Sequence, residues 1–269
     1  MSVNGQALTN PDFWDNYWAK IRLPEQVETN IQWQLALANK FRQYLPNQGS
    51  LKLFEVGGAP GRWLVWFNRE MGYQVSTCDS SPRGVELTLE NLRMANIEGE
   101  VYQTDFLTGS LPEHTFDVVV SIGFIEHFSD PKPIIARHLD LLKPGGLLAL
   151  EVPNMAGLLN LKLLRLAGMQ NFLSVHNLWV MNSTYFQTIA QEFNLKPKFL
   201  GYIGGFDPVI VTGSYPYRIR HIWRTGHFIV PGLVLVERLL FRMAPSFFAK
   251  FNRPWCSSML LGIFQTPYR

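Results

Sequence analysis

The sequence predicts an α/β fold with a seven-stranded, mostly parallel sheet covered by helices on both faces. From residue 51 onward, short apolar runs alternate with amphipathic segments of helical period, and the turns between them are short. With 47% hydrophobic and 17% charged residues, the chain has the apolar side chains that a sheet buried on both faces needs. Repeated strand–helix units of this kind form parallel sheets with right-handed crossovers.

Length and cysteine content set the broad class of the protein. The 269 residues suit one domain, or one domain with a cap. Cys78 and Cys256 are too few for a disulfide framework and lack metal-site spacing, which favours a reducing compartment. The first residues have neither a basic nor an apolar segment, so no signal peptide is expected. We expect a cytoplasmic protein.

The N-terminal residues 1–49 are expected to form a helical cap, with helical structure over 9–45. Pro11 and Asp12 suit a helix start and precede aromatic residues on one face. A second amphipathic piece ends at Pro46. The aromatic side chains suit packing. The alternative is that the first helix forms a flap over a site.

The core is expected to comprise residues 50–206 and 257–269. Ligands bind such sheets beyond the carboxyl ends of the strands, so those ends are the places to search for a site. Strands are predicted at 51–56, 74–78, 101–104, 116–121, 147–152, 198–203 and 259–265, and helices at 62–71, 84–95, 133–142 and 185–193.

Residues 207–256 form a long, aromatic insert before the last strand. After residue 207 the chain has eight lysines and arginines against one acid, Glu237, which suggests an anionic substrate or surface. The insert's apolar stretch, 228–241, is interrupted by Glu237 and Arg238 and is shorter than the roughly 20 residues of a spanning helix. Two functions stay open: a lid over a bulky, partly apolar substrate, or peripheral membrane contact through 228–241.

A glycine-rich turn follows the first predicted strand. Glu55 lies two residues before Gly57, and Gly58 and Gly61 complete the turn before a helical segment. Such turns let the backbone approach a ligand and present the N–H groups of the helix start. A carboxylate beside the turn would repel a pyrophosphate but suits an amine or ribose hydroxyls. By itself, the turn also fits an ordinary strand-to-helix loop.

The next two strands also end in carboxylates. Asp79 lies 22 residues after Gly57, the usual distance for a carboxylate that accepts hydrogen bonds from ribose hydroxyls. Asp105 and Phe106 offer an acceptor for an exocyclic amine beside an aromatic face. Helix capping explains each carboxylate alone, but it hardly explains three at successive strand ends.

Residues 50–152 resemble the core of class I S-adenosylmethionine-dependent methyltransferases. Residues 55–61 are similar to that family's acidic, glycine-rich loop, and 79, 105–106, 126–127 and 143–146 match its later landmarks in order. Ala59 departs from the pattern, because the family has a glycine there, so the loop is expected slightly farther from its ligand. The resemblance implies a Rossmann-like sheet and S-adenosylmethionine as cofactor, and the chain is similar to ubiquinone-pathway-type small-molecule O-methyltransferases.

The resemblance also implies roles for individual residues. The methionine end of the cofactor would be held by Glu55, Gly57, Gly58, Ala59 and Gly61. The nucleoside would be bound by Asp79 and Ser80 at the ribose, and by Asp105 and Phe106 at the adenine. The pocket beneath the sulfonium would be lined by Ser121, Ile122 and Gly123.

Two histidines are candidates for the acceptor side, where a hydroxyl benefits from a base of near-neutral pKa. His127 follows the fourth strand, and either serves as base or orienting group or caps the next turn. His176 is the second candidate, because similar O-methyltransferases often carry a histidine after the fifth strand. The six histidines lack zinc-site spacing and the paired acids of a catechol-type magnesium site are not evident, so no metal is expected.

We therefore expect methyl transfer to a small or lipid-like acceptor at a hydroxyl oxygen. The alternatives are an N-methyltransferase, a nucleic-acid methyltransferase, a dehydrogenase and a non-catalytic nucleotide-binding protein. Glu55 argues against the dehydrogenase. The fourth strand lacks the Asn/Asp-Pro-Pro-aromatic motif of base-amine methyltransferases, so no nucleic-acid partner is expected. The oligomeric state stays open.

Overall fold

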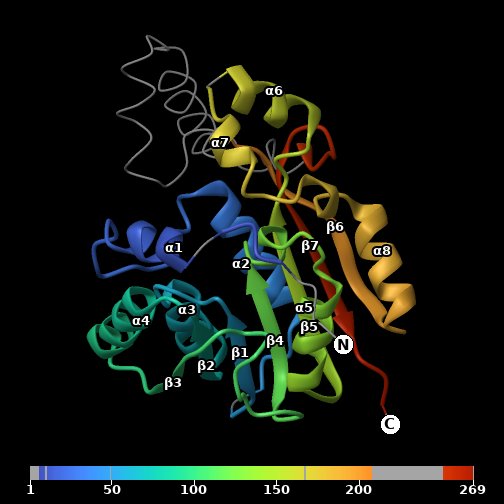
Figure 1. Cartoon of the computed structure of the whole chain (residues 1–269). Helices are drawn as coiled ribbons and strands as arrows, with labels where there is room; N and C mark the ends of the chain where they lie inside the picture. The colour runs from blue at the N-terminus through green and yellow to red at the C-terminus, as the bar shows by residue number, and fades with distance from the viewer. Residues whose placement is uncertain (1–5, 10, 49, 167, 208–250, 269) are drawn as a thin grey trace.

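The computed structural model describes residues 6–9, 11–48, 50–166, 168–207 and 251–268, which form a seven-stranded sheet (Figure 1). The strand order is β3-β2-β1-β4-β5-β7-β6. β7 is antiparallel to both β5 and β6, and the other neighbouring pairs are parallel. This arrangement confirms the predicted Rossmann-like fold class. The strands are β1 (Lys52–Val56), β2 (Gln74–Asp79), β3 (Gly99–Gln103), β4 (Phe116–Ile122), β5 (Leu142–Pro153), β6 (Lys196–Phe206) and β7 (Ser257–Gln265).

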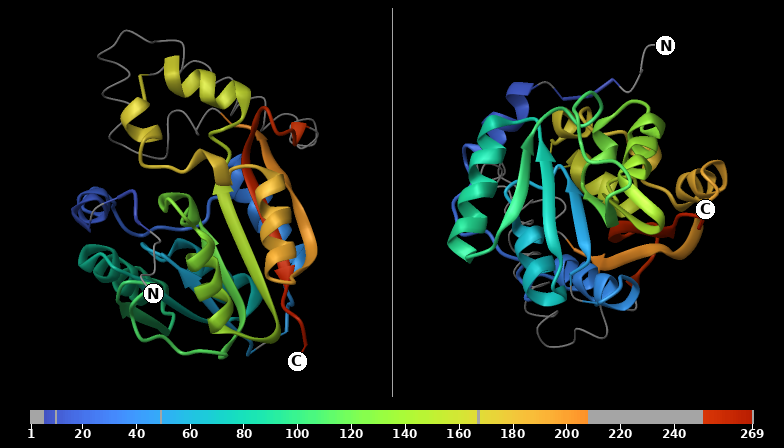
Figure 2. Two further views of the ribbon diagram at one scale, coloured as in Figure 1. Left: turned by 45° about the vertical axis from the view of Figure 1, so that its right-hand side comes forward. Right: turned by 90° about the horizontal axis from the view of Figure 1, so that it is seen from below.

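Helices cover both faces of this sheet (Figure 2). On one face, Phe41 and Phe67 pack in a buried cluster with Leu53 of β1. On the other face, Ile134 and Phe186 pack in a second cluster. The helices of the first face are α2 (Gln32–Tyr44), α3 (Arg62–Met71) and α4 (Pro82–Ala95), and those of the second are α5 (Lys132–Leu141) and α8 (Ser183–Glu192). Alternate residues of each strand therefore enter opposite cores, as a doubly covered sheet requires.

The register brings the chemically important strand ends to one edge of the sheet. Val56 is level with Cys78 on β2 and with Ser121 on β4. Ile122 is level with Glu151 on β5. The glycine turn, Asp79 and the residues after β4 therefore meet at the carboxyl edge, where ligands bind in parallel sheets.

The N-terminal region differs from the expected helical stretch. α1 spans Pro11–Trp18, and the segment 19–31 between α1 and α2 is not helical. Pro24 has no amide hydrogen to donate within a helix. The Asn91 side chain holds the backbone of Glu25 in place of helical hydrogen bonds, accepting from its N–H at 3.0 Å and donating to its carbonyl at 2.9 Å.

The chain between β5 and β6 contributes three short elements and α8. Asn182 caps α8 by accepting a hydrogen bond from the Tyr185 N–H at 2.9 Å. The short elements are α6 (Leu158–Leu166), α7 (Gln170–Leu173) and the 3-10 turn η2 (Leu178–Val180). No helix of the described residues is long and apolar enough to cross a membrane.

Most of the predicted insert, residues 208–250, lies outside the described residues, and so does the stretch 228–241. The strands on either side of it are described. β6 runs parallel to β5, because both are antiparallel to β7, and Phe206 is level with Ser257. The insert therefore leaves and rejoins the sheet at the carboxyl edge.

Candidate active site

A cavity of about 770 Å³ opens at the carboxyl edge of the sheet. It is lined by residues from the glycine turn, from the ends of β2 to β5, from α1 and from the segment before η2. Among the predicted site residues, those that line it are Glu55, Gly57, Gly58, Ala59, Asp79, Ser80, Asp105, Phe106, Ile122, Gly123, His127 and His176. Gly61 and Ser121 do not line it: Gly61 is the N-cap residue before α3, and Ser121 is fully buried in the sheet.

The glycine turn is held tightly against the neighbouring strand. The Gly57 N–H donates to the Cys78 carbonyl at 3.0 Å, and the Gly58 N–H donates to Thr77 Oγ1 at 3.1 Å. Gly57 has a φ of +67°, which only glycine adopts readily. A Cβ at Gly58 would lie 2.5 Å from Thr77 Oγ1. At position 59 the backbone φ is not positive, so alanine can replace the family's glycine there without backbone strain.

Glu55 presents a buried carboxyl group at this turn. The residue is 4% exposed, and its Oε2 atom has no hydrogen-bond partner in the described part of the chain. Burial raises the pKa of Glu55 to about 8, although the positive charge of Arg62 opposes the shift. Arg62 itself forms an ion pair with Glu25 at 2.5 Å. Glu55 thus offers an acceptor that a cationic ligand group in the cavity would satisfy.

The two aspartates are used differently. Asp79 Oδ1 accepts from the Ser81 N–H at 2.8 Å, and burial raises the Asp79 pKa to about 6. Asp105 Oδ1 accepts from the N–H groups of Leu107 and Thr108 at 2.9 and 3.0 Å, so one of its oxygens orders the loop after β3. The hydrogen bonds of Asp105 all use Oδ1, so its Oδ2 atom is left for a ligand, whereas the Ala59 N–H also bonds to Asp79 and favours its ionised form.

The Phe106 side chain is more buried than its predicted role requires. It is 5% exposed, and its ring packs edge-on against His138 at 4.8 Å and against Phe124 at 5.8 Å. Phe106 therefore both lines the cavity and packs in the buried core cluster of this face of the sheet.

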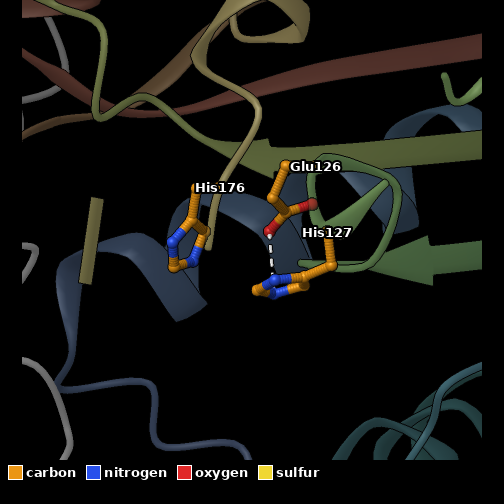
Figure 3. A group of neighbouring side chains, drawn as sticks. All are labelled: Glu126, His127 and His176. Carbon is orange, nitrogen blue, oxygen red and sulfur yellow. Dashed lines mark ion pairs between the residues drawn. The ribbon is translucent and has the colours of Figure 1, made fainter. Parts of the chain in front are cut away.

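At the opposite end of the site, a 3-10 turn after β4, η1 (Ile125–His127), brings together Glu126 and His127, and His176 lies beside them (Figure 3). The two imidazole rings are 4.5 Å apart. The Asn177 N–H donates to the Glu126 carbonyl at 2.6 Å, and the Asn177 side chain donates to the Phe128 carbonyl at 3.1 Å. These bonds hold the segment of His176 against η1.

This end of the cavity is buried and contains several acidic groups. His127 is 7% exposed, and burial lowers its pKa to about 4, so its imidazole is neutral at pH 7. Burial raises the pKa of Glu126 to about 8. Glu151, at the end of β5, is 1% exposed, and burial together with the charge of Glu126 raises its pKa well above the ordinary range. The lone pairs of the neutral His127 imidazole and of the carboxyl oxygens make this end suited to a hydroxyl or a cation.

The N-terminal segment covers the end of the cavity that contains His127. Trp14, Tyr17 and Trp18 of α1 line the cavity. The Leu8 N–H donates to the His127 carbonyl at 2.8 Å, and the Ser81 hydroxyl hydrogen-bonds to Asp15. α1 therefore lies where a flap over the site would lie, and its aromatic side chains line the cavity in addition to packing against one another.

Several lining residues were not among the predicted site residues. The sequence could have indicated Glu151 as a site residue, because it is a lone acid in an otherwise apolar predicted strand. It could also have indicated Glu126, which is adjacent to His127. The residues missed are Trp14, Tyr17, Trp18, Glu126 and Glu151.

Comparisons with known proteins agree with this geometry. A family model described as "Methyltransferase domain" matches residues 28–197. The ubiquinone biosynthesis O-methyltransferase of Cereibacter sphaeroides (strain ATCC 17025) is 28% identical over 110 residues, which are 41% of this chain and 44% of the relative. The match thus spans less than half of that curated relative.

Solved structures share the fold at low sequence identity. Phosphoethanolamine N-methyltransferase 2 of Haemonchus contortus, in complex with S-adenosyl-L-methionine, aligns with a TM-score of 0.55 and 15% identity over 95% of this chain and 56% of its own. Geranyl diphosphate C-methyltransferase of Streptomyces coelicolor aligns with a TM-score of 0.59 and 13% identity over 95% of this chain and 96% of its own. The proteins similar to this chain thus include methyltransferases named for oxygen, nitrogen and carbon acceptors.

Proposed function

Because the chain belongs to the methyltransferase domain family, with S-adenosylmethionine as cofactor, we propose that it methylates a hydroxyl oxygen of a small or lipid-like acceptor. The main support for the proposal is that one cavity has two ends of different chemistry. One end has the glycine turn with Glu55 and Asp79, and the other has His127 and His176.

The first end fits the cofactor. The buried Glu55 Oε2 lacks a partner, and the ammonium of the methionine moiety would satisfy it. Asp79 would accept hydrogen bonds from the ribose hydroxyls and Asp105 from the adenine amine, while Gly57 and Gly58 keep the turn free of side chains. When bound, the cofactor supplies an electrophilic methyl group on a sulfonium. The protein residues bind it, orient it and limit its contact with water.

The second end supports an oxygen acceptor. His127 is neutral and nearly buried, so its imidazole is available to accept a hydrogen bond from a hydroxyl and orient the oxygen. With a pKa of about 4 it is a weak base at pH 7, which favours orientation over full proton removal. The similarity to ubiquinone biosynthesis O-methyltransferases also favours oxygen.

We assign the domains as the sequence suggested: a helical cap over 1–49, a cofactor-binding core over 50–206 and 257–269, and an insert over 207–256. The ends of the insert meet the carboxyl edge, and Ser258 and Met259 line the cavity. This placement supports a role for the insert in covering a bulky acceptor.

A screen with methyl-labelled cofactor tests the proposal. The full chain is incubated with matched phenols, alcohols, amines and thiols, including alkylated phenols, and the labelled products are identified by mass spectrometry. We expect label on a hydroxyl oxygen, with faster transfer to the alkylated phenols. Label confined to nitrogen or carbon acceptors would refute the oxygen assignment, while cofactor binding by calorimetry tests the cofactor site separately.

A further inference from the structure

We propose that Asp15 is a positioning residue: it fastens α1 to the loop after β2, so that cofactor binding at this loop holds α1 over the other end of the cavity. α1 lies above α4, the helix that this loop leads into (Figure 1). The link itself needs only the cofactor site, whereas the statement that the covered end binds the acceptor rests on the proposed function.

The Asp15 carboxylate binds the start of α4. It accepts hydrogen bonds from the Ser81 hydroxyl and from the Arg83 N–H, the latter at 3.2 Å. Ser81 is the N-cap residue of α4, is 2% exposed, and accepts from the Gly84 N–H at 2.9 Å. A negative charge beside a helix N-terminus is favourable, because unpaired N–H groups point toward it. Asp15 therefore docks α1 on a site that the start of α4 provides.

The same loop holds the carboxylate of the cofactor end. The Ser81 N–H donates to Asp79 Oδ1 at 2.8 Å, while the Ser81 hydroxyl donates to Asp15. Ser81 thus contacts both carboxylates, through different groups. Asp79 lines the cavity, so a ligand that fixes Asp79 also fixes the donors that bind Asp15.

The Trp18 ring of α1 packs onto the same region. A Cβ atom at Gly84 would lie 2.9 Å from Trp18 Cδ1 and 3.0 Å from the Cβ atom of Ala59 in the glycine turn. The first turn of α4, the glycine turn and α1 thus meet at one place, and Trp18 also lines the cavity. A cofactor bound at this end would gain contacts with α1 only while α1 is docked, and such a difference shifts a conformational equilibrium.

The segment before α1 is fastened to the other end of the cavity. The Leu8 N–H donates to the His127 carbonyl at 2.8 Å. The Ser129 N–H donates back to the Gln6 carbonyl at 3.0 Å. The N-terminal segment therefore connects the loop after β2 with the turn after β4, and the docking of α1 influences both.

The position of α1 depends on these contacts. α1 has eight residues, and none whose exposure the structure describes is buried, whereas six residues of α3 are buried. Helices of this length are marginal by themselves, and segments with few buried contacts open at a lower free-energy cost than the core does. By linkage, the factor by which the cofactor favours the docked helix equals the factor by which docking tightens cofactor binding.

Hydrogen exchange tests this coupling without any acceptor. Exchange of the Leu8 and Ser129 amides in the full chain is measured with and without S-adenosylhomocysteine, at concentrations where calorimetry shows the site to be filled. In wild type we expect the ligand to slow both amides about 5-fold or more, the lower end of typical coupling factors. In Asp15→Ala the slowing should be lost, and Kd should rise by a similar factor. The matched control is Asn16→Ala, a truncation at the exposed neighbouring residue of α1.

A pH profile separates positioning from a general loss of structure. Burial and, second to it, the negative charge of Asp15 raise the pKa of Asp79 to about 6, against the hydrogen bonds from the Ser81 and Ala59 N–H groups. The affinity of wild type for S-adenosylhomocysteine should therefore rise with pH through about 6. In Asp15→Ala the midpoint should move to lower pH, and in Asn16→Ala it should stay.

The outcomes separate the coupling from the proposed function. Amides at Leu8 and Ser129 that do not respond to the bound ligand in wild type would refute the coupling. Wild-type slowing in Asp15→Ala, or an unmoved midpoint in that variant, would refute the role of Asp15. Exchange in β1, read in the same experiment, shows that the variant is folded. Since no acceptor is used, these failures leave the proposed hydroxyl methylation standing, and a failure to methylate hydroxyls leaves the coupling standing.

Discussion

The Trp14 ring of α1 packs edge-on against the His127 ring of η1, with centroids 4.9 Å apart and an interplanar angle of 89°. This contact joins the N-terminal segment to the end of the cavity that we propose binds the acceptor. Trp14 also stacks on Trp18 at 5.9 Å, so α1 covers the site with a row of aromatic side chains. The helix belongs to the site although it precedes the cofactor-binding core.

Replacing Trp14 with alanine should therefore impair the acceptor side and spare the cofactor side. An edge-on aromatic pair contributes about 0.5–1.5 kcal/mol, so we expect kcat/KM for the acceptor to fall by roughly 2–10-fold. The measurement is steady-state kinetics together with calorimetry of cofactor binding. Trp179→Ala is the control, because Trp179 is 75% exposed and outside the cavity. Equal kinetics in the two variants would show that α1 does not shape the acceptor site.

Replacing Glu55 with glutamine should weaken cofactor binding. The substitution keeps the shape of the side chain but removes the negative charge that would pair with the cofactor's ammonium. A hydrogen bond to a charged group contributes about 1.5–3 kcal/mol, so Kd should rise roughly 10–150-fold. Isothermal titration calorimetry with S-adenosylhomocysteine, which keeps the ammonium, measures the effect. An unchanged Kd would mean that the methionine end binds elsewhere.

The same carboxyl group should make the ligand-free protein less stable as pH rises. Burial raises the Glu55 pKa in the folded state from 4.5 to about 8, so between these values the folded protein binds a proton that the unfolded chain has lost. Linkage then requires the free energy of unfolding to fall with rising pH across that window. Arg62 is the charged neighbour that limits the shift.

Urea unfolding of wild type and Glu55→Gln at several pH values from about 5 to 8 measures this linkage. We expect a steeper loss of stability in wild type than in the variant, while Glu126 and Glu151 contribute a similar slope to both proteins. Added S-adenosylhomocysteine should reduce the difference, because its ammonium favours the ionised carboxylate. Parallel curves for the two ligand-free proteins would show that Glu55 is already ionised near pH 5.

Replacing Asp79 with alanine should reduce cofactor affinity by one to two orders of magnitude. The loss of a charge-assisted partner for the ribose hydroxyls costs about 1.5–3 kcal/mol. Asp79 has a pKa of about 6, so wild-type affinity should increase as pH rises through that value and the carboxylate ionises. Calorimetry on either side of pH 6 tests both effects. Equal pH dependence in wild type and variant would assign the titration to another group.

The glycine turn offers a matched pair of substitutions. Gly58→Ala should destabilise the fold by about 1–3 kcal/mol, because its Cβ would lie 2.5 Å from Thr77 Oγ1. Ala59→Gly should cost at most about 1 kcal/mol, through the greater freedom of the unfolded chain. Thermal unfolding measures both. Equal melting temperatures would show that the turn moves to accept the extra methyl group.

Local patterns predicted the elements well, and they predicted most of the residues that line the glycine-turn end of the cavity. The predicted helix over 62–71 matches α3, and β1 differs from its prediction by one residue. The glycine turn connects adjacent elements, Asp79 ends β2, and Asp105 lies two residues beyond the end of β3. Parallel strands bring such ends to one edge whatever the loops between them do, so spacing along the chain was enough to indicate where these residues lie.

The prediction of helical structure over 9–45 is wrong for the segment 19–31. Its sequence lies between two amphipathic pieces, which favoured helix, but the Asn91 side chain binds the backbone of Glu25 from 66 residues away. A tertiary hydrogen-bond pair thus replaced local helical bonds. Phe106 lines the cavity while its ring also packs against His138 and Phe124, so its contact with the adenine stays a prediction.

The sequence by itself determined the sheet, the glycine turn and the carboxylates at its edge, because each depends on residues near one another in the chain. Only the tertiary structure decided that His176 lies beside His127 and Glu126, with the Trp14 ring packed against His127. The segment 172–177 reaches η1 through hydrogen bonds such as that between His127 and the Val175 carbonyl, 48 residues apart. No local period encodes contacts of that range, since they depend on how the chain folds back over the end of the sheet.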